Sequence, residues 1–186
     1  MSFTPTHIPG LKIFEPKIFE DKRGYFFESF NEETFRREGI DVRFVQDNQS
    51  KSSYGVIRGL HYQLNPHAQT KLVRVLEGTI LDVVVDIRKG SPTYGQVFEL
   101  ELSAENKKQL LIPKGFAHGF SVLSEIAVVF YKCDAVYHKD SENGIRFDDP
   151  LLNIDWKIPG KNAVVSEKDL LLPRLDDCKN NFEFNG

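Results

Sequence analysis

The stretch KLVRVLEGTILDVVVDI, residues 71–87, contains two β-rich runs, 71–76 and 79–87, separated by Glu77-Gly78. Valine, isoleucine and leucine dominate both runs, and branched side chains fit the pleated surface of a strand. A Glu-Gly pair between two such runs is typical of a tight turn. The stretch therefore predicts two β-strands joined as a hairpin.

Short apolar runs separated by glycine and proline continue along most of the chain, with little helical periodicity between them. Three further runs predict strands: 25–30, with Phe26, Glu28 and Phe30 on one side; 96–102, with Phe98, Leu100 and Leu102 on one face; and 127–137. Closely spaced strands of this kind favour an antiparallel sandwich or barrel, so the fold class expected is all-β.

Two segments have helix signals. Residues 32–38 follow Asn31, a good N-cap, and precede Gly39, a typical helix stop. A short helical turn starts at Ser166, with Asp169 in the capping-box position. The chain contains no internal repeat, low-complexity tract or linker, so residues 1–186 are expected to form a single domain with a few short peripheral helices.

The bulk composition is that of an ordinary folded protein. The chain has 186 residues, of which 40% are hydrophobic and 12% aromatic, and its net charge is −3. This charge gives no general attraction to nucleic acid or anionic membranes. Two cysteines suit a reducing cytosol, and there is neither a signal peptide nor a run of 18 apolar residues. We therefore expect a cytoplasmic protein with no nucleic-acid or membrane partner.

The segment around His61 is the first candidate for chemistry. If residues 59–63 are extended, His61 and Gln63 point to the same face, whereas Arg58 points to the other. A bulge at Gly59 would turn both His61 and Arg58 inward. A histidine near a lysine such as Lys71 suits proton abstraction beside a carbonyl. A half-buried structural histidine explains the same residues equally well.

Residues 111–120, LIPKGFAHGF, predict a tight bend and a strand that restarts near His118. The pattern resembles the second half of the cupin signature, Pro-x-Gly-x-x-His. The first half of that signature normally supplies two histidines one residue apart and a glutamate as metal ligands. Here it reads His61-Tyr62-Gln63, His67 lies too far along and Glu77 is a turn residue. A cupin-like jelly roll without a metal site is therefore expected.

Several segments, in order from about residue 10 to 175, resemble one family: DKRGYFFE (21–28), QDNQS (46–50), RGLH (58–61), DVVVDIR (82–88), IPKGFAHGF (112–120), YKC (131–133), DDP (148–150) and SEKD (166–169). Together they are similar to the dTDP-4-dehydrorhamnose 3,5-epimerases. The resemblance implies an isomerase that inverts C3 and C5 of dTDP-4-dehydro-6-deoxy-D-glucose to give dTDP-4-dehydro-L-rhamnose, in dTDP-L-rhamnose biosynthesis. It also implies that the enzyme uses no cofactor.

The resemblance assigns four catalytic roles. His61 would remove the protons next to the C4 ketone, Asp169 would orient its ring, Lys71 would sit by the keto oxygen and Tyr131 would reprotonate the carbon from the opposite face. From the residues alone, Asp169 is more simply a capping residue for Ser166, and Lys71 a solvated strand residue. Spacing does not choose between Tyr131 and Tyr137 as the acid, because both could face one cavity.

The resemblance also implies a set of substrate contacts: Arg23, Glu28, Gln46, Asn48, Arg58, Lys71, His118, Tyr137, Glu142 and Lys168. Guanidinium groups suit a diphosphate, and Tyr25 or Phe26 could stack on the thymine ring. In this family the strand 23–28 is expected to reach into the neighbouring subunit's site, which implies a homodimer with strand exchange.

Other motifs point away from cofactor chemistry. No Gly-x-Gly-x-x-Gly motif opens a βαβ unit, residues 90–96 are interpreted as a turn, and Cys133 as a small core residue. Three alternatives to the 3,5-epimerase remain open at this point: a related enzyme that inverts only one centre, a metal-dependent cupin oxygenase, and a non-catalytic sugar-nucleotide-binding protein.

Overall fold

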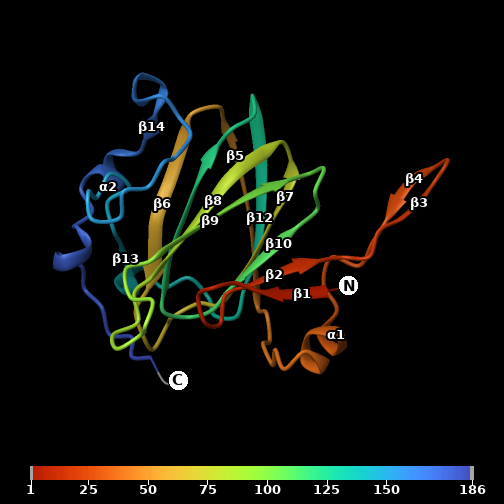
Figure 1. The fold of residues 1–186 in the computed structure, drawn as a ribbon, viewed down its shortest axis with the longest axis horizontal. Coiled ribbons are helices and arrows are strands. Elements are labelled where there is room, and N and C mark those ends of the chain that lie inside the picture. Colours follow the sequence, from red (N-terminus) through yellow and green to blue (C-terminus); the bar gives the residue numbers. More distant parts are fainter. Residues whose placement is uncertain (1, 185–186) are drawn as a thin grey trace.

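In a computed structural model, which describes residues 2–184, two antiparallel sheets pack face to face (Figure 1). The first sheet has the order β1-β2-β10-β7-β12-β5 and the second β13-β6-β11-β8-β9, with β14 added in parallel to β6. Only two short α-helices are present among these residues. The all-β prediction is confirmed.

The element bounds follow the two sheets. The first sheet contains β1 (Ser2–Pro5), β2 (Lys12–Glu15), β5 (Gln46–Ser53), β7 (Lys71–Glu77), β10 (Gln109–Ile112) and β12 (Ile126–Cys133). The second contains β6 (Val56–Gln63), β8 (Thr79–Asp86), β9 (Val97–Ser103), β11 (Phe116–Val122), β13 (Glu142–Gly144) and β14 (Val164–Val165). A separate hairpin, β3 (Phe19–Asp21) and β4 (Gly24–Phe26), projects from the body at the right of Figure 1. The helices are α1 (Glu32–Arg37) and α2 (Glu167–Leu170), with 3₁₀ turns η1 (Lys139–Ser141), η2 (Gly160–Asn162) and η3 (Leu175–Asp177).

The position of strand β8 explains why residues 79–87 are mostly apolar without alternation, with Asp82 and Asp86 as the charged exceptions. Val84 packs in the core between the sheets, whereas Val83 and Val85 pack on the outer face of the second sheet. That outer face is covered by residues from the C-terminal part of the chain, including Trp156 and Phe182. A strand buried on both faces carries a nearly continuous run of apolar side chains. Fully burying each such side chain contributes about 1.5–3 kcal/mol relative to leaving it exposed.

The predicted hairpin of residues 71–87 is wrong, although its two strands and its turn are present. Strand β7 pairs with β10 and β12, whereas β8 pairs with β11 and β9 in the other sheet. Both edges of β7 are already occupied, so the turn at Gly78 carries the chain from one sheet to the other. Gly78 has φ +78°, and a Cβ there would lie 2.0 Å from the carbonyl oxygen of Ile126. Only glycine fits this crossing.

Two other predicted strands end earlier than expected. Strand β4 stops at Phe26, and the exposed fractions of Tyr25 and Phe26 are 59% and 67%, so neither ring is core. Strand β12 stops at Cys133, because the next side chain, Asp134, leaves the ladder and accepts a hydrogen bond from the Thr70 amide (2.7 Å). Cys133 itself is buried, as expected of a core residue.

The prediction for residues 96–102 is confirmed by β9, whose Phe98, Leu100 and Leu102 pack on the core between the sheets. Helix α1 is confirmed as well. The side chain of Asn31 accepts a hydrogen bond from the Thr34 amide (3.2 Å), and Gly39 follows the helix at φ +74°.

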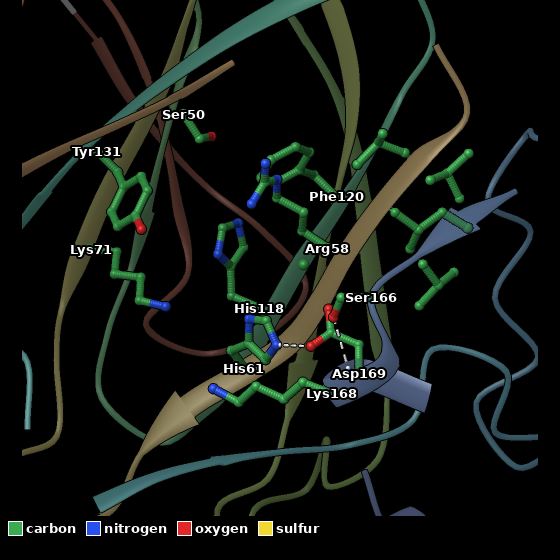
Figure 2. Close-up of a pocket in the computed structure, with 15 residues that line it drawn as sticks. Ser50, Arg58, His61, Lys71, His118, Phe120, Tyr131, Ser166, Lys168 and Asp169 are labelled. Atoms are coloured by element: carbon green, nitrogen blue, oxygen red, sulfur yellow. Dashed lines mark hydrogen bonds and ion pairs between the residues drawn. The ribbon is translucent and has the colours of Figure 1, made fainter. Parts of the chain in front are cut away.

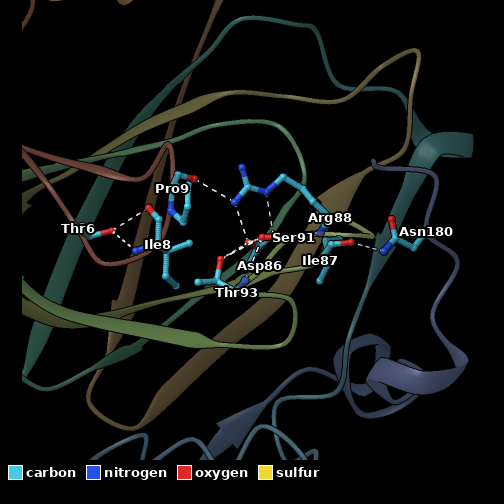
Figure 3. A network of polar contacts seen from close by, with 9 residues as sticks. All are labelled: Thr6, Ile8, Pro9, Asp86, Ile87, Arg88, Ser91, Thr93 and Asn180. Carbon is cyan, nitrogen blue, oxygen red and sulfur yellow. Dashed lines mark hydrogen bonds and ion pairs between the residues drawn. The ribbon is translucent and has the colours of Figure 1, made fainter. Parts of the chain in front are cut away.

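A buried polar network anchors the predicted turn at residues 90–96 (Figure 3). The carboxylate of Asp86 accepts hydrogen bonds from the Arg88 guanidinium (2.8 and 2.7 Å) and from the hydroxyls of Ser91 (2.6 Å) and Thr93 (2.7 Å). Arg88 also donates to the carbonyl of Pro9 (2.9 Å), which ties in the N-terminal loop. Burial alone would raise the pKa of Asp86, but these hydrogen bonds outweigh it and lower the pKa.

None of the helices among residues 2–184 has the length and apolar character needed to span a membrane.

Candidate active site

A cleft with a cavity of about 460 Å³ opens between the two sheets (Figure 2). Its walls come from both sheets and from the segment that carries α2. The side chains that line it include Ser50, Arg58, His61, Lys71, His118, Phe120, Tyr131, Ser166, Lys168 and Asp169. Segments distant in sequence therefore meet around one hollow.

A one-residue bulge in β6 turns two predicted site residues into this cleft. His61 lies opposite His118 on β11, whereas Arg58 lies opposite Phe120, so three steps along β6 match two along β11. Both Arg58 and His61 consequently line the cavity. Gly59 has φ +115°, and a Cβ there would lie 2.6 Å from the Cα of Gly119. The predicted bulge at Gly59 is confirmed.

His61 is held by Asp169 through a bond of 2.7 Å between Nε2 and Oδ1. The other carboxylate oxygen accepts a hydrogen bond from the Gly59 amide (3.2 Å). Burial alone would raise the pKa of Asp169, but these hydrogen bonds and the attraction of His61 lower it below its usual range. An ionised carboxylate only accepts, so Nε2 of His61 carries the hydrogen and Nδ1 is the basic atom.

Asp169 takes part in the helix cap through its backbone amide, as predicted, but its side chain does not. The amide of Asp169 donates to Ser166 Oγ (3.1 Å), which makes Ser166 the N-cap of α2. The carboxylate is directed away from the helix toward His61 (Figure 2). One residue thus takes part in the helix cap and contacts the candidate base.

Lys71 and Tyr131 come from β7 and β12, in the sheet opposite the one that carries His61. Burial lowers the pKa of Lys71, and the nearby Cys133, Asp82 and Glu142 offset part of that effect. Burial raises the pKa of Tyr131. A phenol carries its proton near neutral pH even without this shift, so the hydroxyl has a proton to donate. Figure 2 shows Tyr131 and Lys71 on one side of the hollow and His61 with Asp169 on the other.

His118 forms a second histidine–aspartate pair beside His61. Its Nε2 lies 2.8 Å from Oδ1 of Asp82, and both side chains are buried. Asp82 Oδ2 has no hydrogen-bond partner among residues 2–184. Asp82 was absent from the residues predicted for the site. The available signal was a charged residue inside the otherwise apolar run 80–85.

A second lobe of about 170 Å³ continues from the cleft and shares His61, Lys71 and Tyr131 with it. Tyr137 and Glu142 line this lobe, and the Tyr137 hydroxyl donates to Glu142 Oε2 (2.7 Å). Lys168 Nζ lies 2.6 Å from the same oxygen. Burial alone would raise the pKa of Glu142, but hydrogen bonds from Lys168 and Tyr137 lower it.

Tyr131 and Tyr137 both line this second lobe, as their spacing allowed. The expected reason, that both lie on one strand at an even separation, is wrong. Strand β12 ends at Cys133, and Tyr137 reaches the lobe from the irregular segment that follows. Tyr137 is half-exposed, whereas Tyr131 is half-buried beside Lys71, with Nζ 5.9 Å from its ring centroid.

Strand β5 supplies Gln46, Asn48 and Ser50 from alternate positions, facing the hollow. Sequence patterning did not predict this strand, because its inward side chains are polar and hydrophobic periodicity has nothing to detect. The next inward residue, Ser52, accepts a hydrogen bond from Arg58 Nε (3.1 Å). Ser50 and Ser52 were both missing from the predicted site.

Two predicted contacts lie away from the cleft. Arg23 sits at the tip of the β3–β4 hairpin, paired with Asp21 (2.6 Å) and 84% exposed. Glu28 follows the hairpin and accepts a hydrogen bond from Asn31 (3.0 Å). Neither lines the two lobes that residues 2–184 enclose.

No group of three or more His, Cys, Asp or Glu side chains suited to a metal ion occurs within residues 2–184.

The family model of dTDP-4-dehydrorhamnose 3,5-epimerase matches residues 5–177. The chain belongs to the dTDP-4-dehydrorhamnose 3,5-epimerase family. It is 54% identical over 171 residues to the enzyme of that name from Shigella flexneri, a match that covers 91% of this chain and 93% of the relative.

Solved structures of the family have the same fold. The dTDP-4-dehydrorhamnose 3,5-epimerase of Elizabethkingia anophelis NUHP1 superposes with a TM-score of 0.92 at 53% identity, over 95% of this chain and 97% of that one. The dTDP-6-deoxy-D-glucose-3,5-epimerase of Legionella pneumophila Philadelphia 1, in complex with dTDP-4-keto-L-rhamnose, has a TM-score of 0.90 at 51% identity, over 95% and 93%. The cupin-like fold and the isomerase class predicted from the sequence are confirmed.

Proposed function

We propose that His61 is the general base with which this chain carries out the reaction of its family. The activity is the inversion of C3 and C5 of dTDP-4-dehydro-6-deoxy-D-glucose, giving dTDP-4-dehydro-L-rhamnose, a step of dTDP-L-rhamnose biosynthesis. One observation carries the assignment of roles: the His61–Asp169 pair on one wall of the cleft faces Tyr131 and Lys71 on the other.

Inversion needs a base and an acid on opposite faces of one carbon. His61 Nδ1 takes the proton from C3, and the electrons of the broken C–H bond move into the C4 carbonyl. Lys71 stabilises the negative charge that develops on the keto oxygen. Tyr131 then donates its hydroxyl proton to the carbon from the other side, and the same steps at C5 complete the product.

The proton balance closes without an external reactant. After each inversion His61 carries an extra proton and Tyr131 has lost one, and exchange with water restores both. The attraction between Asp169 and the imidazolium stabilises the intermediate state of the base. Because carbon is neither oxidised nor reduced, the reaction itself calls for no redox cofactor.

The remaining substrate contacts extend along the cleft. Arg58 and Lys168 bind the diphosphate, because a guanidinium and an ammonium complement its negative charge. His118 holds the sugar beside the base. Tyr137 and Glu142, with Gln46 and Asn48, form the wall of the second lobe.

We propose a homodimer in which the β3–β4 hairpin of one protomer enters the cleft of its partner. The hairpin projects from the body (Figure 1). Phe19, Tyr25 and Phe26 are exposed on it. A two-stranded hairpin is marginally stable by itself, which favours a surface to pack on. In the partner's cleft Arg23 and Glu28 would meet the nucleotide, with Tyr25 or Phe26 on the thymine ring.

We also propose that the enzyme is cytoplasmic, because its two free cysteines suit a reducing compartment.

The test of the base is His61→Asn. We expect turnover to be abolished while the fold and the affinity for dTDP are retained, measured by coupling the reaction to the rhamnose-forming reductase and following nicotinamide oxidation. Substantial turnover in this variant would show that His61 is not the base. Proton NMR in deuterated water adds the positions: incorporation at both C3 and C5 supports the 3,5-epimerase, and incorporation at one carbon contradicts it.

A further inference from the structure

The segment of residues 134–138 connects β12 to η1 and carries Tyr137 over the second lobe. It has no regular secondary structure, yet side-chain amides bind the backbone of four consecutive residues in it. Gln69 donates to the carbonyl of Ala135 (2.7 Å), and Gln46 accepts from the amide of Tyr137 (2.8 Å). Gln63 binds the residues on either side of Tyr137. Gln46 is on β5, Gln63 ends β6, and Gln69 lies in the loop that follows β6.

Gln63 is the central member of this set. Its Oε1 accepts a hydrogen bond from the amide of His138 (2.7 Å), while its Nε2 donates to the carbonyls of Val136 (3.3 Å) and His67 (2.7 Å). A primary amide has two N–H donors, and both are occupied here. Gln63 lines the second lobe beside His61, but both of its N–H groups donate to backbone carbonyls and are not available to a substrate.

These bonds matter because burial does little to hold Tyr137. Its side chain is 53% exposed. Its hydroxyl nevertheless meets Glu142, which also pairs with Lys168. The flanking contacts reinforce the backbone: the rings of His67 and His138 stack with centroids 3.8 Å apart and planes 3° apart. An exposed ring with an ordered backbone is a preformed surface, which reduces the entropy lost on binding.

We propose that Gln63 is a positioning residue that holds Tyr137 in place as a wall of the substrate cleft. It acts through the backbone of residues 136 and 138 and touches neither the reacting carbons nor the nucleotide. This inference rests on the proposed role of Tyr137 in substrate binding. The role of Gln63 differs from that of Gln46. The Gln46 amide donates to Asn48 (3.0 Å), and its second N–H has no hydrogen-bond partner within residues 2–184.

The test is Gln63→Met, which keeps the length of the side chain and removes all three hydrogen bonds. We expect KM to rise about tenfold, the scale for losing hydrogen bonds to partly buried backbone groups, with kcat within about threefold. The Kd for dTDP should rise by a similar factor. A matched control is Asn106→Leu, because Asn106 holds its own loop by bonds to Glu101, Ser103 and Lys108 but lines neither lobe. Its KM should not change.

A double-mutant cycle separates positioning from general structural damage. In a Tyr137→Ala background, Gln63→Met should raise KM and the Kd for dTDP no further, because the residue it positions is gone. An equal increase in that background would overturn the proposal, as would an unchanged KM or a loss confined to kcat in the single variant.

If Gln63→Met does not fold, the same double-mutant cycle is run with Gln69→Met, which removes only the bond to Ala135 in the same segment. Failure of the proposed function would appear differently, as absent turnover in the parent enzyme. The Kd cycle for dTDP remains decisive for Gln63 in that case, since it does not depend on turnover.

Discussion

Replacing Asp169 by Asn tests the orientation of the base, because the substitution keeps the shape of the side chain and removes its charge. The Gly59 amide donates to one oxygen of Asp169, so the carbonyl oxygen of the introduced amide should occupy that position. Its NH₂ group then faces Nε2 of His61, 2.7 Å away in the parent. An NH₂ group donates, which forces the ring hydrogen onto Nδ1. The atom that faced the substrate as a base now carries a proton.

The size of the effect follows from the bond that is lost. A hydrogen bond to a charged partner contributes about 1.5–3 kcal/mol. For opposite unit charges 2.7 Å apart, Coulomb's law at an effective dielectric of about 20 sets an upper limit of about 6 kcal/mol. The His61 side chain is 31% exposed, so solvent reduces this attraction. A loss of about 3–5 kcal/mol at the transition state corresponds to a fall in kcat of roughly 10²- to 10⁴-fold.

The assay is the coupled reductase reaction with dTDP-4-dehydro-6-deoxy-D-glucose, together with the melting temperature and the Kd for dTDP. We expect KM and Kd to change by less than about threefold, because Asp169 acts on the base and leaves the binding groups in place. A kcat within about fivefold of the parent would refute the reasoning, since His61 would then need no fixed tautomer. A large rise in the Kd for dTDP would also refute it, by showing that Asp169 shapes the cleft itself.

Three further variants test the proposed acid, the proposed phosphate site and the polar network around Asp86. Tyr131→Phe should lower kcat by about 10²- to 10⁴-fold, because the acid is lost. NMR in deuterated water should still detect exchange of the C3 and C5 hydrogens, which His61 removes. Loss of this exchange together with turnover would contradict a role of Tyr131 confined to the acid. Arg58→Lys should raise KM about tenfold with kcat unchanged, because an ammonium cannot make the paired contacts of a guanidinium, and an unaltered KM would remove Arg58 from the phosphate site. Asp86→Asn should lower the free energy of unfolding by about 3 kcal/mol at pH 7, because Arg88, whose side chain is only 12% exposed, loses its charged partner. The folded-state pKa of Asp86 is lowered, so its contribution is complete above about pH 4 and is lost as the pH falls through that pKa. The Tm difference between Asp86→Asn and the parent should therefore narrow in acid, and a constant difference down to about pH 2 would contradict this account.

Local signals predicted local features correctly. The cap at Asn31, the stop at Gly39, the turn at Glu77-Gly78 and the bulge at Gly59 depend on the conformational preferences of a few residues, and all four are present. The pairing of the strands depends on which edges are free. Sequence could not show that β10 and β12 already occupy both edges of β7, so the hairpin prediction failed.

Strand β5 shows a different limit. Its inward side chains, from Gln46 to Ser52, line a polar hollow, so the apolar alternation that identifies a half-buried strand is absent. Hydrophobic alternation could not place Tyr137 either, because Tyr137 reaches the second lobe from an irregular segment held by glutamine side chains. Hydrophobic patterns locate the core, whereas a site lined with polar groups departs from them.

The sequence by itself determined an all-β chain, its family and the set of residues proposed for the chemistry, because strand propensity and ordered motifs are carried by neighbouring residues. It left the role of Asp169 open, since a capping box needs only a spacing of three. Only the tertiary structure placed that carboxylate 2.7 Å from His61 and put Tyr131 on the opposite wall. Residues more than 100 positions apart meet there because two sheets, not one local element, enclose the cleft.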